Sequence, residues 1–471
     1  MQWRLVPGGL AAGLAIALAA CAGGMLRPDL QRLYMTSKPV AQPPVILIPG
    51  LLGSKLRDTT TGEEIWPGSI TDILFSSYPA LRQEIDPATL EPKPSTLEPF
   101  DITEAALGQD IYRPIMRTLE QAGGYRRAWP GSRAGPLERR YYVLPYDWRQ
   151  DNVRSVHALH GLIEDVRRDY NDPELKVDII AHSMGGLIAR YYLRYGNRDV
   201  LGGNDFPISH AGARNINKLI LLGTPNLGSI TSLHSFLMGY PVIAGRIRTE
   251  DLATMPSGPQ LFPHPLNVWL IKPDGGELVR DLFDEETWRR FQWSIYDPGV
   301  QARIVRRYVS RAEGEAQLKL QQRFFAKHLE RARRFVWSLT VPEPATPIRY
   351  VVFGGGCELT PARVLVEEVG GDSVVRLYPD EIRRPMRGVA YDRVMLEPGD
   401  GTVTKASLLA RESLDPSVPR HKYSFFPLAY SFFLCEEHAR LTSNVNFQDN
   451  LLNVLLERTM EMSPAKHQSR H

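Results

Sequence analysis

The sequence has few cysteines, little net charge and no long hydrophobic run. Only three of its 471 residues are cysteine, and 56 basic residues against 53 acidic ones leave a formal net charge of +3. A protein that binds nucleic acid usually carries a concentrated basic excess, so we expect no nucleic acid partner. No Cys/His pair has the spacing of metal ligands, and we expect neither a metal nor another cofactor.

The apolar stretch at residues 10–20 is too short to cross a bilayer, which needs about 20 apolar residues. Arg4 precedes it and small residues end it, as is typical of a secretory signal. Leu18-Ala-Ala-Cys21 resembles the lipobox of bacterial lipoproteins, which implies cleavage before Cys21 and acylation of that cysteine. We therefore expect an exported protein, lipid-anchored to the bacterial cell envelope at the outer membrane or cell surface. A plain signal peptide with an incidental cysteine is the alternative.

Short apolar runs recur along the chain and predict a parallel sheet. They lie at residues 45–48, 141–144, 177–181, 219–222 and 350–353, with helical patterns between them at 111–122, 153–169 and 187–195. Such runs suit strands buried on both faces, and their alternation with helices implies right-handed βαβ units. The predicted fold class is α/β, with a mostly parallel, doubly wound sheet.

Two stretches depart from this alternation. Residues 54–108 are rich in Pro, Ser and Thr and read as a loop-dominated insertion, while residues 226–345 hold helical patterns and no clear strand. We interpret the second stretch as a helical cap or lid. The expected organisation is a signal peptide (1–20), a tether (21–44), the first part of the core (45–225), the cap (226–345), the second part of the core (346–460) and a tail (461–471).

One helix of the cap is amphipathic and strongly basic. Leu318, Phe325, Leu329, Ala332 and Val336 recur at helical spacing, with basic residues between them. We favour a packed helix with a solvated face. A lid whose basic face meets anionic lipid headgroups is the alternative.

The strongest local signal is Ala181-His-Ser-Met-Gly-Gly186, which joins a strand pattern to a helical one. This is the context of a nucleophile elbow, a turn so sharp that the residues two before and two after the serine must be small. Here those residues are Ala181 and Gly185. The elbow predicts an α/β-hydrolase fold with Ser183 exposed at the carboxyl edge of the sheet. A structural turn that contains a serine by chance is the alternative.

A serine hydroxyl needs a neighbouring base, and in this fold the acid and then the histidine follow the serine along the chain. Asp400 lies in a Gly-Asp-Gly turn after an apolar run and is our candidate acid, although such triplets are commonly ordinary turns. His438 precedes the last helical pattern, where the fold places the base; a surface histidine is the alternative. We expect His182 to support packing and His421 to open a strand over 421–426.

The oxyanion hole requires two backbone donors. One is the amide of the residue after the nucleophile, here Met184, and the other comes from the loop after the first strand. Leu51 is the candidate in that loop, because Gly50 and Gly53 let it turn tightly.

The remaining cysteines, Cys357 and Cys435, lie near the ends of the segments that frame the later half of this site. In an exported chain they would meet an oxidising compartment, and we expect one disulfide between them. Two free, buried thiols are the alternative.

Several segments together resemble the lecithin:cholesterol acyltransferase-like family, which includes lysosomal phospholipase A and diacylglycerol acyltransferases. They are Pro44 to Leu56, Leu144-Pro-Tyr-Asp-Trp-Arg149, Ala181 to Gly186, Gly223-Thr-Pro-Asn-Leu-Gly228, Gly399-Asp-Gly-Thr-Val403 and His438. The resemblance implies Ser183, Asp400 and His438 as a catalytic triad, with Leu51 and Met184 at the oxyanion hole. It also implies that Asp147 and Arg149 form a structural charged pair.

The sequence also departs from that family. Secreted animal members staple a membrane-contacting loop with a disulfide after the first strand, and this chain has no cysteine between Cys21 and Cys357. The cap shows little family pattern beyond residues 255–257 and 261–263.

The predicted reaction is acyl transfer from a lipid ester through an acyl-enzyme. Water as acceptor gives a lipase or phospholipase, and a lipid alcohol gives an acyltransferase. The triad alone does not distinguish them, but a surface lipoprotein meets abundant phospholipid and water, which favours hydrolysis. The alternatives are a carboxylesterase for non-lipid esters and an inactive lipid-binding lipoprotein.

Overall fold

A computed structural model describes residues 28–34, 41–106, 109–135, 137–242, 245–342, 346 and 348–456. The expected signal peptide at 1–20, the acylated Cys21 and the tail at 461–471 lie outside these residues. Within the described ranges, no helix is both long enough and apolar enough to cross a membrane.

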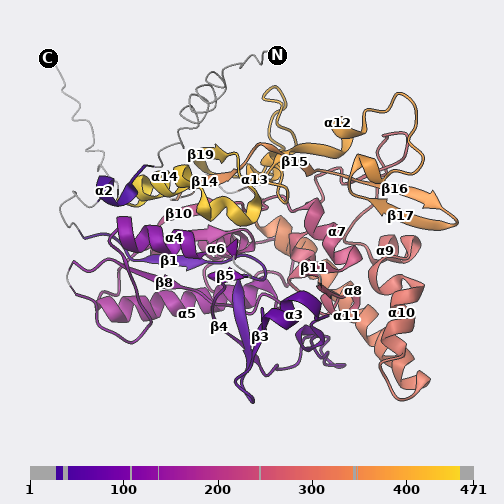
Figure 1. Cartoon of the computed structure of the whole chain (residues 1–471), viewed down its shortest axis with the longest axis horizontal. Coiled ribbons are helices and arrows are strands. Elements are labelled where there is room, and N and C mark those ends of the chain that lie inside the picture. Colours follow the sequence, from indigo (N-terminus) through magenta and orange to yellow (C-terminus); the bar gives the residue numbers. More distant parts are fainter. Residues whose placement is uncertain are drawn as a thin grey trace, which may run out of the picture.

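The core is a seven-stranded sheet in the order β19-β14-β10-β9-β1-β8-β7 (Figure 1). Every neighbouring pair in it is parallel, which confirms the predicted α/β class. The strands are β1 (Val45–Ile48), β7 (Arg126–Arg127), β8 (Arg140–Val143), β9 (Val177–His182), β10 (Ile216–Leu222), β14 (Tyr350–Gly355) and β19 (Leu428–Leu434).

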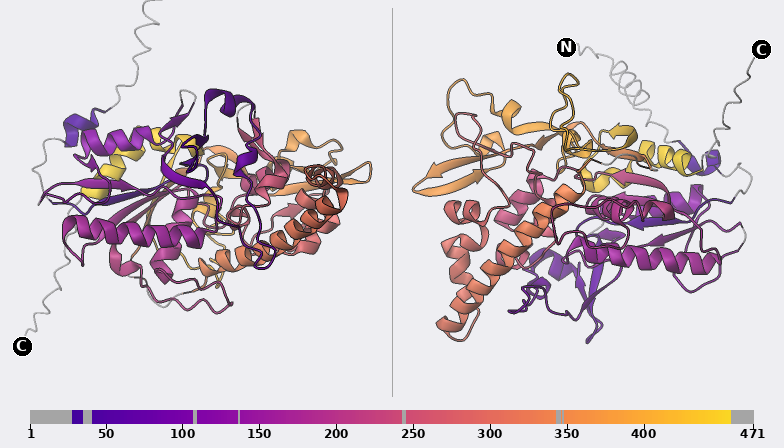
Figure 2. Two further views of the ribbon diagram at one scale, coloured as in Figure 1. Left: turned by 90° about the horizontal axis from the view of Figure 1, so that it is seen from below. Right: turned by 180° about the vertical axis from the view of Figure 1, so that it is seen from behind.

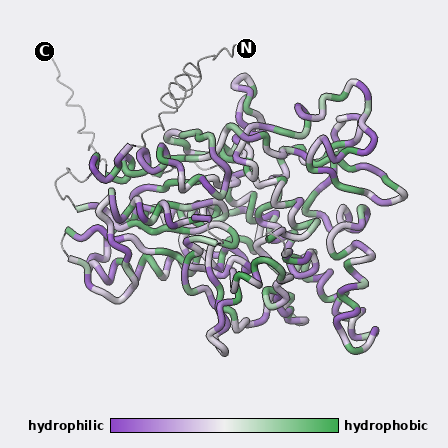
Figure 3. Tube along the Cα trace, in the orientation of Figure 1, coloured by the Kyte–Doolittle hydropathy of each residue, from purple (hydrophilic) through white to green (hydrophobic). Residues whose placement is uncertain are grey.

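Both faces of this sheet are buried, because side chains alternate between two helical layers. Ile46 and Ile48 pack with α5 (Asn152–Tyr170) and α6 (Met184–Tyr195). Val45 and Leu47 pack instead with α4 (Arg113–Arg117), the π-helical turn that continues it (Thr118–Ala122) and α14 (Val445–Leu456). Figure 1 shows the sheet between α5 and the pair α4 and α14, and Figure 3 shows apolar segments running through this sheet.

The insertion at 54–108 is more regular than the sequence predicts. It contains a three-stranded antiparallel sheet of β2 (Ser54–Asp58), β3 (Glu64–Trp66) and β4 (Leu97–Ile102), and the short helix α3 (Ile70–Phe75). The strands are short and carry charged residues such as Arg57 and Asp58. Their pairing depends on partners distant in sequence, which explains why no local pattern revealed them.

The cap expected at 226–345 contains several helices and also short strands. Its helices are α7 (Ile230–Met238), α8 (Thr249–Leu252), α9 (Glu285–Phe291), α10 (Pro298–Val305) and α11 (Arg311–Ser338). The hairpin of β11 (Tyr240–Val242) and β12 (Gly245–Ile247) follows α7. A further short strand, β13 (Leu270–Ile271), forms a sheet with β16 (Val364–Val369) and β17 (Asp372–Arg376). The cap therefore joins two stretches of chain, and part of 346–460 belongs to it.

The cap and the core occupy opposite ends of the molecule. In Figure 1 α9, α10 and the β16–β17 hairpin lie at the end away from α2 (Leu30–Tyr34) and α14, and the rear view in Figure 2 shows the same division. β15 (Glu358–Pro361) and β18 (Leu396–Gly399) pair in an antiparallel ladder, and the stretch of chain between them contains β16 and β17.

The basic helix of the cap, α11, is a packed element, and several of its cations have acidic partners. Lys327 pairs with Glu91, and Arg331 bridges Asp151 and Asp199 at 2.8 Å each. Arg333 and Arg334 pair with acids as well, including the Glu330 of their own helix. These contacts tie α11 to the core and favour the packed interpretation over a lid for headgroups.

Two local expectations differ from the structure. The strand expected at 421–426 is a turn, in which Ser424 N–H donates to the carbonyl of His421, and the edge strand β19 begins at Leu428. Part of the expected tether is also ordered. Leu30 of α2 is buried with Ala122 and Leu452, and the Tyr34 hydroxyl donates to Asp449 at 2.7 Å.

Candidate active site

Ser183 lies on a strained turn between β9 and α6. Its φ is 53° and its ψ is −124°, a conformation that is costly for a residue with a Cβ and that is found at functional sites. A Cβ on Gly185 would lie 2.6 Å from the carbonyl oxygen of Pro49, so only glycine fits there. Met184 is the first residue of α6, and the first amide of a helix has no acceptor within the helix.

His438 and Asp400 meet Ser183 in one hydrogen-bonded line. His438 Nε2 lies 3.0 Å from Ser183 Oγ, and its Nδ1 lies 2.8 Å from Asp400 Oδ2. Ser183 follows β9 and His438 lies after β19, both strands of the core, whereas Asp400 directly follows β18 of the small β15–β18 sheet. This arrangement allows the ring to take a proton from the hydroxyl while the carboxylate fixes the tautomer.

Asp400 has hydrogen bonds besides the one to the His438 ring. Its carboxyl group is buried, and Oδ1 accepts the backbone N–H groups of Thr402 at 3.0 Å and Val403 at 2.7 Å. Its own carbonyl accepts the backbone N–H of His438 at 2.9 Å. The acid loop and the histidine loop therefore hold each other through backbone as well as side-chain bonds.

His182 supports the site and does not face the Ser183 hydroxyl. Its Nδ1 lies 2.8 Å from the Tyr112 hydroxyl, and its Nε2 lies 3.3 Å from the carbonyl oxygen of His438. Burial, reinforced by repulsion from the nearby His438, lowers the pKa of His182 to about 3, so its ring is neutral at ordinary pH.

The loop after β1 forms a tight turn against the nucleophile. Gly53 N–H donates to the carbonyl of Gly50 at 3.0 Å, and Leu52 takes a positive φ of 62°. A Cβ on Gly50 would lie 2.7 Å from the Cβ of Ser183, so the backbone of this turn runs directly past the serine. Leu51, the candidate oxyanion donor, is the next residue in the turn.

The Pro-Tyr-Asp-Trp-Arg segment holds this turn from the side of the insertion. Tyr146 Oη donates to the carbonyl of Pro49 at 2.9 Å, and Trp148 Nε1 donates to the carbonyl of Ser54 at 3.1 Å. The hydroxyl of Ser257, in the cap, donates to the carbonyl of Trp148 at 2.5 Å. We call the turn at residues 50–53 the oxyanion turn, after its candidate donor Leu51. The segment thus connects this turn to the cap.

Asp147 and Arg149 form the charged pair that the resemblance implies. Arg149 is fully buried and donates to both carboxyl oxygens of Asp147, from Nε at 2.9 Å and from an Nη at 2.8 Å. It also reaches the Ser95 hydroxyl at 3.2 Å. Because a buried guanidinium is costly without partners, this pair fixes the insertion against the core rather than taking part in chemistry.

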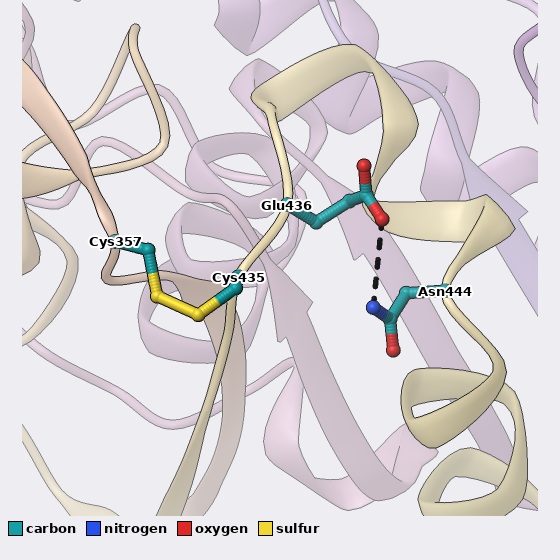
Figure 4. Close-up of a disulfide and its surroundings, with 4 residues drawn as sticks. All are labelled: Cys357, Cys435, Glu436 and Asn444. Carbon is teal, nitrogen blue, oxygen red and sulfur yellow. Dashed lines mark hydrogen bonds between the residues drawn. A yellow bond between two sulfur atoms is a disulfide. The ribbon is translucent and has the colours of Figure 1, made fainter. Parts of the chain in front are cut away.

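Cys357 and Cys435 form a disulfide at the edge of the site (Figure 4). Cys357 follows β14 and Cys435 follows β19, so the bond joins the carboxyl ends of two adjacent parallel strands. Figure 4 also shows the hydrogen bond from Asn444 to the Glu436 carboxylate, next to Cys435. Cys435 lies three residues before His438, and the disulfide therefore restrains the loop that carries the candidate base.

A small apolar pocket adjoins the turn at residues 50–53. The cap hairpin contributes Tyr240 and Ile247 to it, and Ser232 and Ser235 are among its few polar residues. Its apolar walls include Leu51, Leu52, Trp148, Phe236, Met255 and Leu261. A pocket of this composition suits a hydrocarbon chain.

The structure brings the predicted site residues to one place: Ser183, Asp400, His438, Leu51 and Met184. Sequence reasoning missed Tyr112 and the role of Tyr146. Tyr146 stood in a recognised motif, whereas Tyr112 lies at the start of a helical pattern that carries no sign of a functional site. Among the residues that the structure describes, no three His, Cys, Asp or Glu side chains are arranged to hold a metal ion.

Comparisons with known proteins bear on this geometry. The family model described as lecithin:cholesterol acyltransferase matches residues 137–410, more than half of the chain. Among curated proteins, none matches the sequence.

Solved structures resemble the chain at low sequence identity. A chain of the Tle4–Tli4 complex has a TM-score of 0.52 at 17% identity, covering 88% of this chain and 98% of that one. Lipase 1 from Pelosinus fermentans has a TM-score of 0.37 at 13% identity, covering 89% and 100%. EstA from Clostridium botulinum has a TM-score of 0.36 at 12% identity, covering 89% of each chain. At 17% identity the first likeness concerns the fold alone.

Proposed function

The chain belongs to the lecithin:cholesterol acyltransferase family, and from that premise we propose that it is a serine enzyme acting on lipid esters through an acyl-enzyme. The observation that carries the proposal is the line from Ser183 through His438 to Asp400, with distances of 3.0 Å and 2.8 Å. A serine paired with a base that a carboxylate orients is the arrangement that activates a hydroxyl for attack.

The first half of the reaction forms the acyl-enzyme. Ser183 Oγ attacks the ester carbonyl carbon while its proton passes to His438 Nε2, and Asp400 stabilises the resulting imidazolium. The amides of Leu51 and Met184 bind the oxyanion of the tetrahedral intermediate. When the intermediate collapses, the carbon–oxygen bond to the leaving alcohol breaks and His438 protonates that alcohol.

The second half releases the acyl group. Water or a lipid alcohol gives a proton to His438 and attacks the acyl carbon through its oxygen. Collapse of the second intermediate returns the proton to Ser183 and releases a fatty acid or a new ester. The chemistry at Ser183 is the same for both acceptors. We propose hydrolysis as the main reaction, because water and phospholipid are abundant at a cell envelope.

Two features support a lipid rather than a small soluble ester. The first is the apolar lining of the pocket beside Leu51, which suits contact with the hydrocarbon part of a lipid. The second is a set of exposed apolar side chains where the insertion meets the cap: Ile70 and Phe75 of α3 are 66% and 75% exposed, and Met238 at the end of α7 is 51% exposed. Arg246 links these positions, since its backbone N–H donates to Ser76 and its guanidinium donates to the carbonyl of Met238.

We further propose that the protein is exported and anchored to the cell envelope by acylation of Cys21. The motif Leu18-Ala-Ala-Cys21 supports this proposal. Growth with a labelled fatty acid tests it: the wild-type protein is expected to carry the label in the membrane fraction, and Cys21→Ala to lose it. Label retained by Cys21→Ala would contradict the anchor.

The test of substrate class is hydrolysis of a long-chain phospholipid in vesicles and of a short-chain soluble ester, with a sterol present as acceptor. We expect faster release of acyl chains from vesicles, with fatty acid as the main product and no turnover by Ser183→Ala. Preference for the soluble ester would favour a general carboxylesterase. Absence of product from either ester, by folded protein, would favour the inactive lipid-binding lipoprotein.

A further inference from the structure

One peptide group beside the nucleophile is held by two tyrosines. The peptide between Pro49 and Gly50 accepts a hydrogen bond at its carbonyl from Tyr146 Oη, at 2.9 Å. Its N–H, on Gly50, donates to Tyr112 Oη at 2.8 Å. With both polar atoms engaged from different elements, the plane of this peptide has one orientation. The next peptide, which carries the Leu51 N–H, is held by the bond from Gly53 N–H to the Gly50 carbonyl at 3.0 Å.

The bond at Tyr112 continues toward the candidate base. The Tyr112 hydroxyl lies 2.8 Å from His182 Nδ1, and His182 Nε2 lies 3.3 Å from the carbonyl oxygen of His438. A carbonyl oxygen only accepts, so the proton of His182 is on Nε2 and Nδ1 is the acceptor. The Tyr112 hydroxyl therefore donates to His182 and accepts from Gly50. Each hydrogen bond in this series, from Gly50 to His438, therefore has a defined donor and a defined acceptor.

This direction depends on a neutral His182. If the ring were protonated, both nitrogens would donate, and the Tyr112 oxygen would face two donors while its own proton lost its acceptor. Burial prevents this, since it lowers the pKa of His182 to about 3. Neutrality also matters for His438, because the two rings lie 4.9 Å apart and a cation at His182 would repel the imidazolium formed during catalysis.

We propose that Tyr112 and His182 are positioning residues. They fix the position of the Leu51 amide, the oxyanion donor, relative to the backbone of His438, the base, with Ser183 between the two. This inference rests on the proposed function. The two catalytic groups belong to loops about 390 residues apart in sequence, and the chain Gly50–Tyr112–His182–His438 connects them directly through four buried or half-buried residues. No proton moves along it: the chain fixes geometry, and Ser183, His438 and the leaving alcohol exchange the proton.

The decisive variant is Tyr112→Phe, which keeps the ring and removes the hydroxyl. Gly50 then loses its acceptor and His182 its donor, so the oxyanion turn can shift by a fraction of an ångström. Because errors of about 1 Å cost roughly 100-fold in rate, we expect kcat to fall about 10- to 100-fold with KM little changed. The matched control is Tyr142→Phe, another buried tyrosine whose hydroxyl donates to Asp169 at 2.9 Å, away from the site.

Two readouts separate positioning from a loss of folded protein. Active sites are first counted with a serine-directed phosphonate, so that kcat is expressed per reactive Ser183. The inhibition constant of a trifluoromethyl ketone with a matching acyl chain is then measured, because its adduct carries the oxyanion. We expect Tyr112→Phe to weaken this inhibitor by the same factor as it lowers kcat, and Tyr142→Phe to change neither value.

Equal kcat per site and equal inhibitor affinity in the two tyrosine variants would overturn the inference. If Tyr112→Phe does not fold, His182→Gln and His182→Phe decide instead. Glutamine can still donate toward the His438 carbonyl and accept from Tyr112, so it is expected to retain at least about tenfold more kcat per site than phenylalanine. Equal losses in those two variants would also overturn it. The proposed function fails separately, if Ser183→Ala retains the wild-type turnover.

Discussion

Gly355 and Asp400 are in such close contact that a Cβ atom on Gly355 would lie 2.5 Å from the Cβ of Asp400. The same atom would lie 2.6 Å from the carbonyl oxygen of Glu436, in the loop that leads to His438. The end of β14 therefore serves as the surface against which both the acid loop and the histidine loop pack. Only glycine leaves room for both loops at this point.

Replacing this glycine is expected to disturb both loops at once. Gly355→Ala must displace Asp400 or Glu436, so we expect kcat/KM to fall at least about tenfold, together with a lower melting temperature. The control is Gly161→Ala in the exposed interior of α5, where a Cβ meets nothing within 4 Å. It should leave kcat/KM unchanged and stabilise the protein by about 1 kcal/mol. Unchanged kcat/KM in Gly355→Ala would contradict the packing argument.

Asp400→Asn tests the orientation of the base. An amide nitrogen facing His438 Nδ1 would donate to it and move the ring proton to Nε2, which then cannot accept the proton of Ser183. We expect kcat to fall about 10⁴-fold while the protein stays folded. Steady-state kinetics and circular dichroism check this result. Asp415→Asn, at an exposed turn, is the control and should behave as wild type.

The disulfide is expected to contribute to both stability and activity. Cys357 and Cys435 are 78 residues apart, and cross-links over loops of this size typically stabilise a protein by about 2–5 kcal/mol. Reduction should therefore lower the melting temperature and, by loosening the loop before His438, lower kcat. The double variant Cys357→Ser/Cys435→Ser should reproduce both effects and no longer respond to reductant. A wild-type protein whose melting temperature ignores reductant would contradict this role.

His264 predicts a specific loss of stability in acid. It is fully buried in the cap; its Nδ1 accepts from Leu266 N–H at 3.2 Å, so Nε2 donates to the Thr340 hydroxyl at 2.9 Å. Burial, which is the main cause, lowers its pKa to about 3, well below the value of about 6.5 expected in the unfolded chain. Between these values the unfolded state binds the proton and the folded state does not. The free energy of unfolding therefore falls as the pH drops from about 6.5 toward 3.

The measurement is urea unfolding at pH 7 and pH 4.5 for the wild type, His264→Gln and the exposed-site control His157→Gln. His264→Gln should lose less stability than the wild type between the two pH values, by up to about 1.4 kcal/mol per pH unit. His157→Gln should follow the wild type. Identical pH dependence in all three proteins would show that His264 does not titrate as its burial requires.

Much of the core could be predicted from local patterns. The strands β1, β9, β10 and β14 each contain a short apolar run, because both faces of the sheet are covered, and burial on two faces favours such runs. Ser183 could be predicted for a different reason, because the sharp turn requires small residues at positions 181 and 185, and these are Ala181 and Gly185. Asp400 and His438 had no strong local pattern and depended on the order of residues in the fold.

Elements that depend on distant partners could not be predicted in the same way. The tetrapeptide Tyr-Ser-Phe-Phe occurs twice, at 423–426 and at 430–433, and only the second copy is a strand. Pro427 follows the first copy, and its carbonyl accepts the N–H of Tyr350 where β19 begins to pair with β14. The role of Tyr112 could not be predicted for a related reason. Its partners, Gly50 and His182, are distant in sequence and contact it only in the folded protein.

The central claim is that Ser183 carries the acyl group during turnover. Its most direct test is to mix the protein with a phospholipid, quench in acid within the first turnover and identify the modified peptide by mass spectrometry. We expect a fatty acyl group on Ser183 in the wild type and none in Ser183→Ala. An acyl group on another residue, or product formation by Ser183→Ala at the wild-type rate, would contradict it.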